Sequence, residues 1–130
     1  MYRCVTNLIE ITVEPTFLED ESSPYSGKYL WSYEINIANL SSQTAQLISR
    51  RWEICNAYGH WHYVQGEGVV GEQPTLGPGE RYIYTSYVPL DTPSGVMLGR
   101  FYVRLDHQDP IPVAIPTFSL DSPHSTPTLN

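Results

Sequence analysis

Lysine and long apolar segments are scarce in this sequence. Lys28 is the single lysine, and fourteen acidic residues against seven Lys and Arg give a net charge of −7. Such a charge repels phosphate backbones, so nucleic acid is not expected as a ligand. No segment approaches the ~20 apolar residues of a membrane span, and Glu10 interrupts the N-terminal segment before a signal peptide could form. We therefore expect a cytoplasmic protein without membrane contact.

Cysteines and catalytic motifs are also few. A reducing compartment keeps the two cysteines, Cys4 and Cys55, as free thiols. The sequence contains no Gly-x-Ser-x-Gly elbow, His-Glu-x-x-His helix, Walker loop or Cys-x-x-Cys pair. Neither an enzyme nor a cofactor is therefore predicted. Asn39-Leu40-Ser41 fits a glycosylation acceptor, which matters only in a secreted chain.

Apolar residues recur with a period of two along the whole chain, and no stretch keeps a helical period. The 130 residues are 41% hydrophobic, with 11 Pro and 9 Gly as punctuation, which suits one domain. These features predict an all-β fold: a single antiparallel two-sheet β-sandwich of the immunoglobulin or fibronectin III type, with about seven strands. The expected strands are residues 6–14, 28–39, 46–56, 60–66, 81–88, 96–105 and 112–120. Residues 121–130 are expected to form a mobile tail beyond an ordered core at about 5–120.

Two of these strands carry specific expectations. In the strand over 28–39, alternation places five apolar side chains on one buried face, namely Tyr29, Trp31, Tyr33, Ile35 and Ile37. The strand over 6–14 is expected to stop at Pro15, which cannot donate to a ladder. Left as an exposed edge, this strand could pair with its copy, so a monomer and an edge-paired homodimer both remain open.

The segment around His60-Trp61-His62 raises the question of a metal site. A two-residue turn at Tyr58-Gly59 would place Cys55 opposite His62 and give a ligand set suited to Zn²⁺ or Co²⁺. A three-residue loop would instead place Ile54 opposite His62 and turn Cys55 away. The second register groups the apolar Trp52, Ile54 and Val64, so we prefer it and predict no metal site. His60 and His62 are the candidate ligands should one exist.

Exposed aromatics and acidic clusters are the other candidates outside the glycine-rich segment. Trp61 and Tyr63 at the same hairpin are candidates for a surface that contacts a partner protein, because aromatic residues contribute strongly to interfaces. Glu19, Asp20 and Glu21 form one acidic group, and Asp106 and Asp109 form another. Both are interpreted as solvated loop charge rather than as Mg²⁺ sites.

Three glycines follow a Gly66-x-Gly68-x-x-Gly71 pattern, which matches the dinucleotide fingerprint as a string. The fingerprint needs a following helix, and the prolines at 74 and 78 forbid one. The main interpretation is a bulge or tight bend that needs glycine. The alternative is a nest of N–H groups that binds a phosphate-containing small ligand such as pyrophosphate. Glu67 and Glu72 oppose a bare anion and would tolerate a metal-bridged one.

Four separated segments resemble the ApaG family in their order. They are Gln65–Pro74, Leu76–Tyr84, Thr92–Gly95 and Ile115–Phe118, and Arg51-Trp52-Glu53-Ile54 precedes them. The resemblance implies an ApaG domain over about 3–127 with an immunoglobulin-like sandwich. Separately, the Leu76–Tyr84 segment resembles the corner of fibronectin III and immunoglobulin sandwiches, so Tyr82 or Tyr84 is a candidate corner tyrosine whose hydroxyl satisfies backbone groups of the preceding turn.

The same resemblance implies a function without naming a site. ApaG proteins have no established enzymatic activity, and bacterial members are associated with cobalt and magnesium resistance. Related domains occur in F-box proteins and in a polymerase-interacting protein. The expected function is therefore a protein-interaction module linked to divalent-cation homeostasis, with another protein as its partner.

Overall fold

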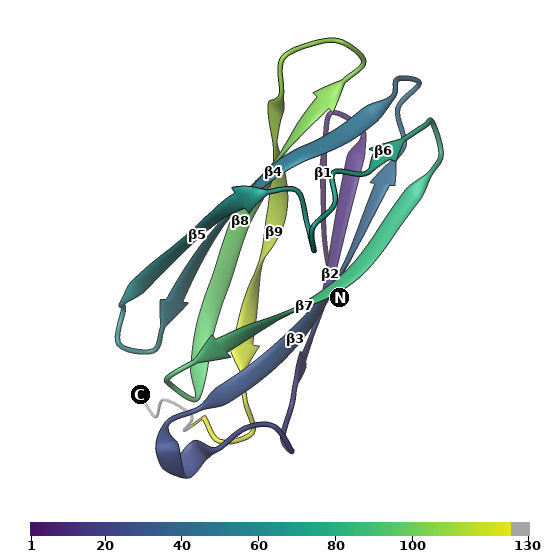
Figure 1. The fold of residues 1–130 in the computed structure, drawn as a ribbon. Helices are drawn as coiled ribbons and strands as arrows, with labels where there is room; N and C mark the ends of the chain where they lie inside the picture. The colour runs from purple at the N-terminus through teal and green to yellow at the C-terminus, as the bar shows by residue number, and fades with distance from the viewer. Residues whose placement is uncertain (126–130) are drawn as a thin grey trace.

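The computed structural model describes residues 1–125, which form two β-sheets packed face to face (Figure 1). The sheets contain nine strands, and a short 3₁₀ turn, Pro24–Ser26, precedes the third. The strands are β1 (Tyr2–Thr6), β2 (Ile9–Phe17), β3 (Tyr29–Asn39), β4 (Ala45–Asn56), β5 (Trp61–Glu67), β6 (Thr75–Leu76), β7 (Arg81–Leu90), β8 (Ser94–Leu105) and β9 (Ile111–Asp121). The predicted all-β two-sheet antiparallel sandwich is confirmed, with two more strands than expected.

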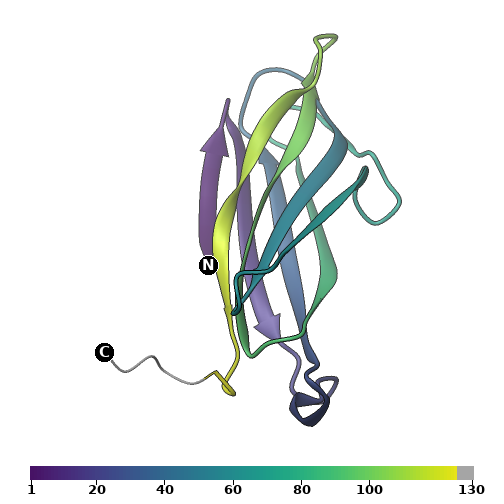
Figure 2. The ribbon, with the colours of Figure 1, turned by 90° about the vertical axis from the view of Figure 1, so that its left-hand side faces the viewer.

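One sheet has the strand order β1-β2-β3-β7 and the other β5-β4-β8-β9, with β6 also paired to β4. All pairings are antiparallel. Seen at right angles to the first view, the sheets form two layers (Figure 2). In the described part of the chain, no helix is both long and apolar enough to cross a membrane.

The strand expected over residues 6–14 differs in both its extent and its position. It continues through Pro15, which lies opposite Tyr33 of β3, and ends at Phe17. Pairing between β1 and β2 stops at Val13. Beyond that residue the outer edge of β2 has no paired strand in the described part of the chain, so the missing backbone N–H of Pro15 breaks no hydrogen bond there. The prediction that this strand is an exposed edge is also wrong, because β1 covers it from Ile9 to Val13.

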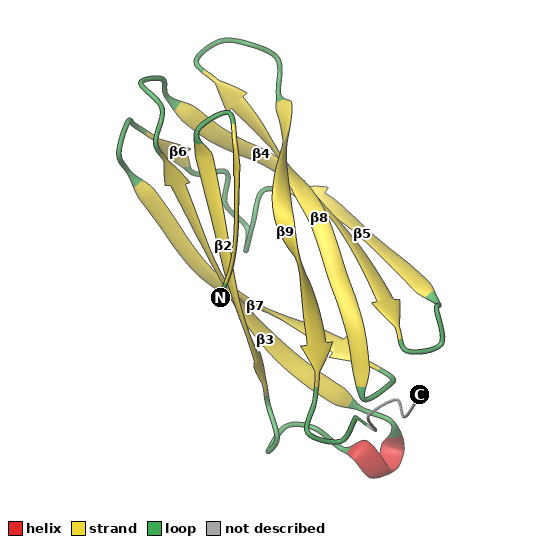
Figure 3. Cartoon of the chain, turned by 180° about the vertical axis from the view of Figure 1, so that it is seen from behind, coloured by secondary structure: helices red, strands yellow, loops and turns green. Residues whose placement is uncertain are grey.

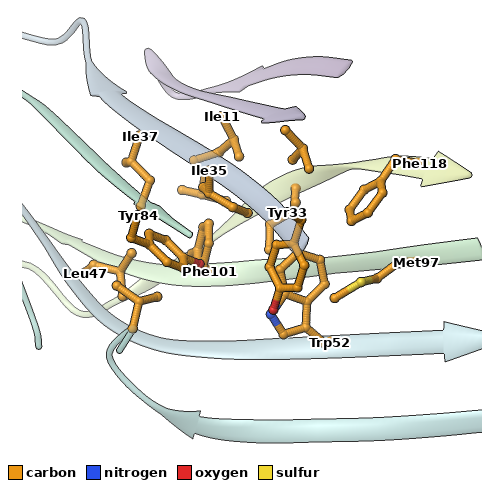
Figure 4. Packing of buried hydrophobic residues seen from close by; sticks show 14 of the residues in the cluster. Ile11, Tyr33, Ile35, Ile37, Leu47, Trp52, Tyr84, Met97, Phe101 and Phe118 are labelled. Atoms are coloured by element: carbon orange, nitrogen blue, oxygen red, sulfur yellow. The ribbon is translucent and has the colours of Figure 1, made fainter. Parts of the chain in front are cut away.

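Aromatic side chains from both sheets meet in the core (Figure 4). Trp52 of β4 makes edge-on contacts with Tyr33 at 5.3 Å and Phe118 at 6.1 Å between ring centroids. The five alternating side chains of β3 that were expected to be buried are all in this cluster. Edge-on aromatic pairs stabilise a core beyond the contribution of their buried area, so these rings tie the two sheets together.

The two lateral sides of the sandwich differ. On one side, β1 lies against β9, as the view from behind shows (Figure 3). There the backbone N–H of Ala114 donates to Thr6 Oγ1 at 3.3 Å, and that of Ser119 donates to Tyr2 Oη at 3.4 Å. On the other side, the edge strands are β5 and β7, which are not paired with each other. The sandwich is therefore closed along one side and open along the other.

Asn39, the asparagine of the glycosylation tripeptide, has a structural role at the end of β3. Its side chain is fully buried, and its amide donates to the carbonyls of Gln43 at 2.8 Å and Leu76 at 3.0 Å. Its Oδ1 accepts bonds from both the N–H and the hydroxyl of Ser41. The folded chain thus presents no free amide at this tripeptide.

The C-terminal segment is ordered further than expected. Ser122 is buried, and its N–H donates to the carbonyl of Pro93 at 3.0 Å. The His124 ring lies against Phe17 and within 3.0 Å of a Glu19 carboxylate oxygen. The expected core limit at about residue 120 is therefore too short by at least five residues. The remainder of the predicted mobile tail, 126–130, lies outside the described residues.

Candidate functional site

The β4–β5 hairpin has the register that places Trp52, Ile54 and Val64 on one face, as preferred from the sequence. Ile54 lies opposite His62 and Cys55 opposite Trp61, and the N–H of Asn56 donates to the His60 carbonyl at 3.0 Å. The preferred three-residue loop is thus confirmed. Cys55 consequently faces away from His62, so the proposed set of two imidazoles and a thiol is not brought together.

Asn56 fixes the hairpin through its side chain. Its Oδ1 accepts the N–H groups of Tyr58 at 2.9 Å and His60 at 3.0 Å, which closes the loop around the amide. Its Nδ2 donates to Asp91 Oδ1 at 3.0 Å, and the Ala57 N–H donates to Thr92 Oγ1. The hairpin is therefore held by the β7–β8 connection as well as by its own ladder.

Strand β5 forms the outer edge of the five-stranded sheet (Figure 1). Its side chains are exposed on both faces. On the outer face, Trp61 is 47% and Tyr63 61% exposed, with near-parallel rings 6.5 Å apart between centroids. Both residues had been selected from the sequence as candidates for a partner surface. The structure places them side by side, at the free edge and away from the core.

Arg51 of β4 packs beside this aromatic pair. Its guanidinium carbon lies 5.7 Å from the centroid of the Tyr63 ring, a cation–π geometry. Its Nη2 is 3.6 Å from Glu53 Oε1, and its Nε is buried without a hydrogen-bond partner in the described part of the chain. The guanidinium therefore has donors that the protein itself does not use.

The inner face of β5 borders a cleft of about 430 Å³ at the open side of the sandwich. His62 and Val64 form one wall, Val88 and Leu90 of β7 lie across from them, and Lys28 is at the rim. No group of three or more His, Cys, Asp or Glu side chains is placed to hold a metal ion within residues 1–125. His60 and His62 therefore lack further protein ligands of these types in the described region.

The predicted acidic groups have structural partners. Glu19 contacts His124, whereas Asp106 accepts bonds from the Thr44 N–H at 2.9 Å and from Gln43 Nε2 at 3.1 Å. These bonds hold the β3–β4 connection against the β8–β9 connection. They account for Glu19 and Asp106 without a metal.

The glycine-rich segment contains a tight turn. Val69 and Glu72 exchange both backbone hydrogen bonds, and the two residues between them have positive φ, 43° at Val70 and 81° at Gly71, as in a type I′ turn. The N–H of Gly68, also at positive φ, donates to the Ile48 carbonyl at 2.8 Å. The N–H groups of Gly68, Val69 and Glu72 are thus committed, which favours the structural interpretation over an anion nest.

Arg50 occupies the space that a side chain at Gly66 would need. Its guanidinium lies 2.8 Å from where a Cβ would be, and Nη1 donates to the carbonyls of Glu67 and Gly68 at 3.1 and 2.9 Å. The arginine therefore binds the outgoing end of β5 through its carbonyls. A larger residue at position 66 would displace the Arg50 guanidinium, so this glycine has a packing explanation.

The expected corner tyrosine is absent at both candidate positions. Tyr82 donates its hydroxyl to Glu72 Oε2 at 3.1 Å rather than to a backbone group, and desolvation together with this contact raises the pKa of Tyr82. The Tyr84 hydroxyl is buried without a hydrogen-bond partner in residues 1–125, and this burial raises its pKa. Neither hydroxyl satisfies the preceding turn, so that prediction is wrong.

Sequence reasoning missed Arg51 and Asn56 as parts of the site. Arg51 belongs to a segment that carried the family resemblance, but its contact with Tyr63 follows only from the hairpin register. Asn56 directly precedes the predicted loop, where asparagine is common because its side chain can bind backbone N–H groups. That turn preference was the available signal.

The fold and site together define a small all-β sandwich protein with one open lateral side and an aromatic edge strand. The ApaG domain model matches residues 19–105, and curated ApaG proteins from Bradyrhizobium diazoefficiens and Paramagnetospirillum magneticum are 52% and 48% identical over the full length of both chains. The chain belongs to the ApaG family.

One solved structure agrees with this assignment, and a second has the same fold. A protein described as the putative ApaA protein from Bordetella pertussis is 36% identical, with a TM-score of 0.85 over 95% of this chain and 98% of that one. The C-terminal domain of wzt has a TM-score of 0.57 at 14% identity, covering 96% of this chain and 79% of that one, which shows a shared fold alone.

Proposed function

We propose that this chain is a non-enzymatic, cytoplasmic binding module that contacts another protein through the outer face of its β4–β5 hairpin. The observation that carries the proposal is the stacked pair of Trp61 and Tyr63 on an edge strand. Interface energy concentrates in aromatic and arginine side chains, and Arg51 lies beside Tyr63. The three residues form a contiguous patch of these types.

The geometry of the patch supports binding because it is already organised. The rings are near-parallel, and Asn56 fixes the hairpin from behind through its bonds to the loop and to Asp91. A surface that is held in place loses less conformational freedom on binding than a mobile one. The link to divalent-cation homeostasis is a separate part of the proposal, which rests on the family resemblance.

The contact surface can be tested with a matched pair of tyrosines. Tyr63 and Tyr87 are both 61% exposed, but Tyr87 lies on β7 in the other sheet. The full-length protein and its Trp61→Ala, Tyr63→Ala and Tyr87→Ala variants would be immobilised and exposed to extract of the source organism, and bound proteins quantified by mass spectrometry. We expect a partner retained by wild type and Tyr87→Ala and lost from the other two. Capture that is equal in all four would contradict the proposal.

The cation part needs a cellular measurement. Cells lacking the gene would be complemented with the wild type, with Tyr63→Ala or with Tyr87→Ala, and their growth compared across Co²⁺ and Mg²⁺ concentrations. We expect wild type and Tyr87→Ala to restore cobalt tolerance and Tyr63→Ala to fail. Equal growth of the complemented and uncomplemented cells would remove cation homeostasis from the proposal.

A further inference from the structure

Arg51 and Arg100 lie directly opposite each other on neighbouring strands β4 and β8. Trp52 and Phe101, the next residues along each strand, are buried in the core, so the two arginines are on the outer face of the sheet. Like charges in this relation destabilise a sheet. The pair is therefore a feature that the fold alone does not favour.

The carboxylates near this pair do not neutralise it. Arg51 has one ion pair, at 3.6 Å to Glu53, and Arg100 has no carboxylate within 4.0 Å among the described residues. Of the other charged side chains on this face, Arg104 and Glu67 lie farther along the strands in one direction, and Asp121 lies toward the hairpin. The two opposite arginines thus have one carboxylate contact between them, in a chain with twice as many acidic as basic residues.

Aromatic rings hold both guanidinium groups in position. Arg51 packs on Tyr63, while Arg100 lies 5.9 Å from the centroid of the Tyr102 ring and donates its Nε–H to the Tyr102 hydroxyl at 2.9 Å. The Nε of Arg51 is buried without a partner in residues 1–125, so a ligand would have to bind the Nη groups of this guanidinium. Guanidinium groups fixed in this way keep N–H donors for a carboxylate, which they bind with two parallel hydrogen bonds.

A hollow of about 360 Å³ lies on the same face, nearer the hairpin. Trp61 forms one wall, Cys55, Ala57 and Val96 contribute apolar lining, and Asp121 adds one carboxylate. Cys55 is four residues from Arg51 along β4, so the hollow and the arginine pair are about 13 Å apart. In an extended peptide, side chains four positions apart are separated by about this distance and point the same way.

We propose that this outer face binds an extended, acidic segment of a partner protein. An apolar side chain of the segment enters the hollow beside Trp61, and a carboxylate four residues away binds Arg51 and Arg100. The inference rests on the proposed function and adds the chemistry of the partner. Its selectivity comes from the two opposite arginines and its anchoring from the hollow beside Trp61.

The probe is a display library of random twelve-residue peptides, selected against the full-length protein and read by sequencing. We expect enrichment of Asp or Glu four positions from a large apolar residue. Enriched peptides, made individually, should bind roughly tenfold more weakly to the Arg51→Gln and Arg100→Gln variants. Each variant loses hydrogen bonds between a charged guanidinium and the peptide carboxylate, and such a loss weakens binding by about this factor. Arg81→Gln, on β7 of the other sheet, is the matched control and should bind normally.

A charge reversal provides the second arm. The Arg51→Glu, Arg100→Glu double variant should enrich Lys and Arg at the position where wild type enriches acids. Urea unfolding of each variant establishes that it is folded before binding is measured. If the double variant does not fold, the two single glutamine variants decide the test.

The outcomes separate the two proposals. Enrichment of neutral peptides whose binding needs Trp61 but neither arginine would contradict the proposal of an acidic segment. It would still support the hairpin face as the contact surface. Failure to enrich any peptide that needs Trp61 would overturn both. Self-association of the protein that is lost in the arginine variants would assign the face to a second copy instead and overturn the partner segment.

Discussion

Asn56 Nδ2 donates a hydrogen bond to Asp91 Oδ1 at 3.0 Å and so joins the β4–β5 hairpin to the β7–β8 connection. Asn56 is buried, whereas Asp91 is exposed at the cleft between the two sheets. The bond crosses the open side of the sandwich near the hairpin, where no ladder connects β5 to β7. The position of the aromatic patch therefore depends on a side-chain contact with the opposite sheet.

Replacing Asn56 with Ala should destabilise the protein by about 2–3 kcal/mol. The change removes three side-chain hydrogen bonds and leaves the N–H groups of Tyr58 and His60 without their partner. Urea unfolding followed by tryptophan fluorescence measures the loss. Gln65→Ala, an exposed position on β5, serves as the control and should change stability by less than about 0.5 kcal/mol. A similarly small effect at Asn56 would show that the loop does not depend on its amide.

Replacing Val70 with Asn should stabilise the protein by about 1 kcal/mol. Val70 has φ of 43° in the type I′ turn, a conformation that a β-branched residue rarely adopts and that asparagine tolerates well. Its side chain is 56% exposed, so little packing is lost. The urea midpoint should rise with an unchanged m-value. A lower midpoint would mean that Val70 makes a contact worth more than its backbone strain.

Gly68→Ala should lower the free energy of unfolding by about 2–3 kcal/mol, a larger loss than Gly59→Ala causes at the hairpin. Both glycines have positive φ, but an added Cβ at Gly68 would collide with the Glu72 carbonyl oxygen, whereas nothing lies within 4 Å at Gly59. The difference between the two variants isolates the effect of close approach from that of backbone conformation. Equal losses in thermal unfolding would rule out a tight contact at Gly68.

Tyr84→Phe should raise stability by about 1 kcal/mol near neutral pH, because it removes a buried hydroxyl that has no partner in residues 1–125. Burial raises the pKa of Tyr84 above the ordinary value of 10.0, so the unfolded chain releases this proton first as the pH rises. The free energy of unfolding of the wild type should therefore fall above about pH 10, and that of Tyr84→Phe should fall less over the same pH range.

Urea unfolding at about pH 8 and about pH 10.5, on either side of the ordinary tyrosine pKa, measures both effects on Tyr84→Phe. Tyr87→Phe, at an exposed position, is the control. A variant that is less stable than wild type at the lower pH would indicate that the hydroxyl has a partner, such as a bound water.

The sequence predicted elements whose side chains alternate strongly between buried and exposed. Strand β3 is such a case, because every second residue from Tyr29 to Ile37 reaches the core. Strand β1 was missed because neither of its faces is fully buried, and β6 because its two residues become a strand only by pairing with Ala45 and Gln46. These elements are defined by their neighbours rather than by their own composition.

The part of the candidate site that depends on the β4–β5 register could be predicted from the sequence. Grouping Trp52, Ile54 and Val64 on one face gave the correct hairpin pairing, and with it the position of Trp61 and Tyr63 on the opposite face. The Arg51–Arg100 pair could not be found in this way. The β4–β8 register shifts between Leu47 and Ser49, and no pattern in the sequence marks that irregularity.

The bonds from Tyr2 and Thr6 to β9 have a consequence for the synthesis of the protein. Tyr2 is made before all the strands that follow β1, but its hydroxyl accepts the N–H of Ser119, 117 positions later. During translation, the final contacts of β1 therefore form only after β9 has been made. A fold dominated by such distant contacts forms slowly, so the β1–β2 hairpin should remain without its β9 contacts until β9 has left the ribosome.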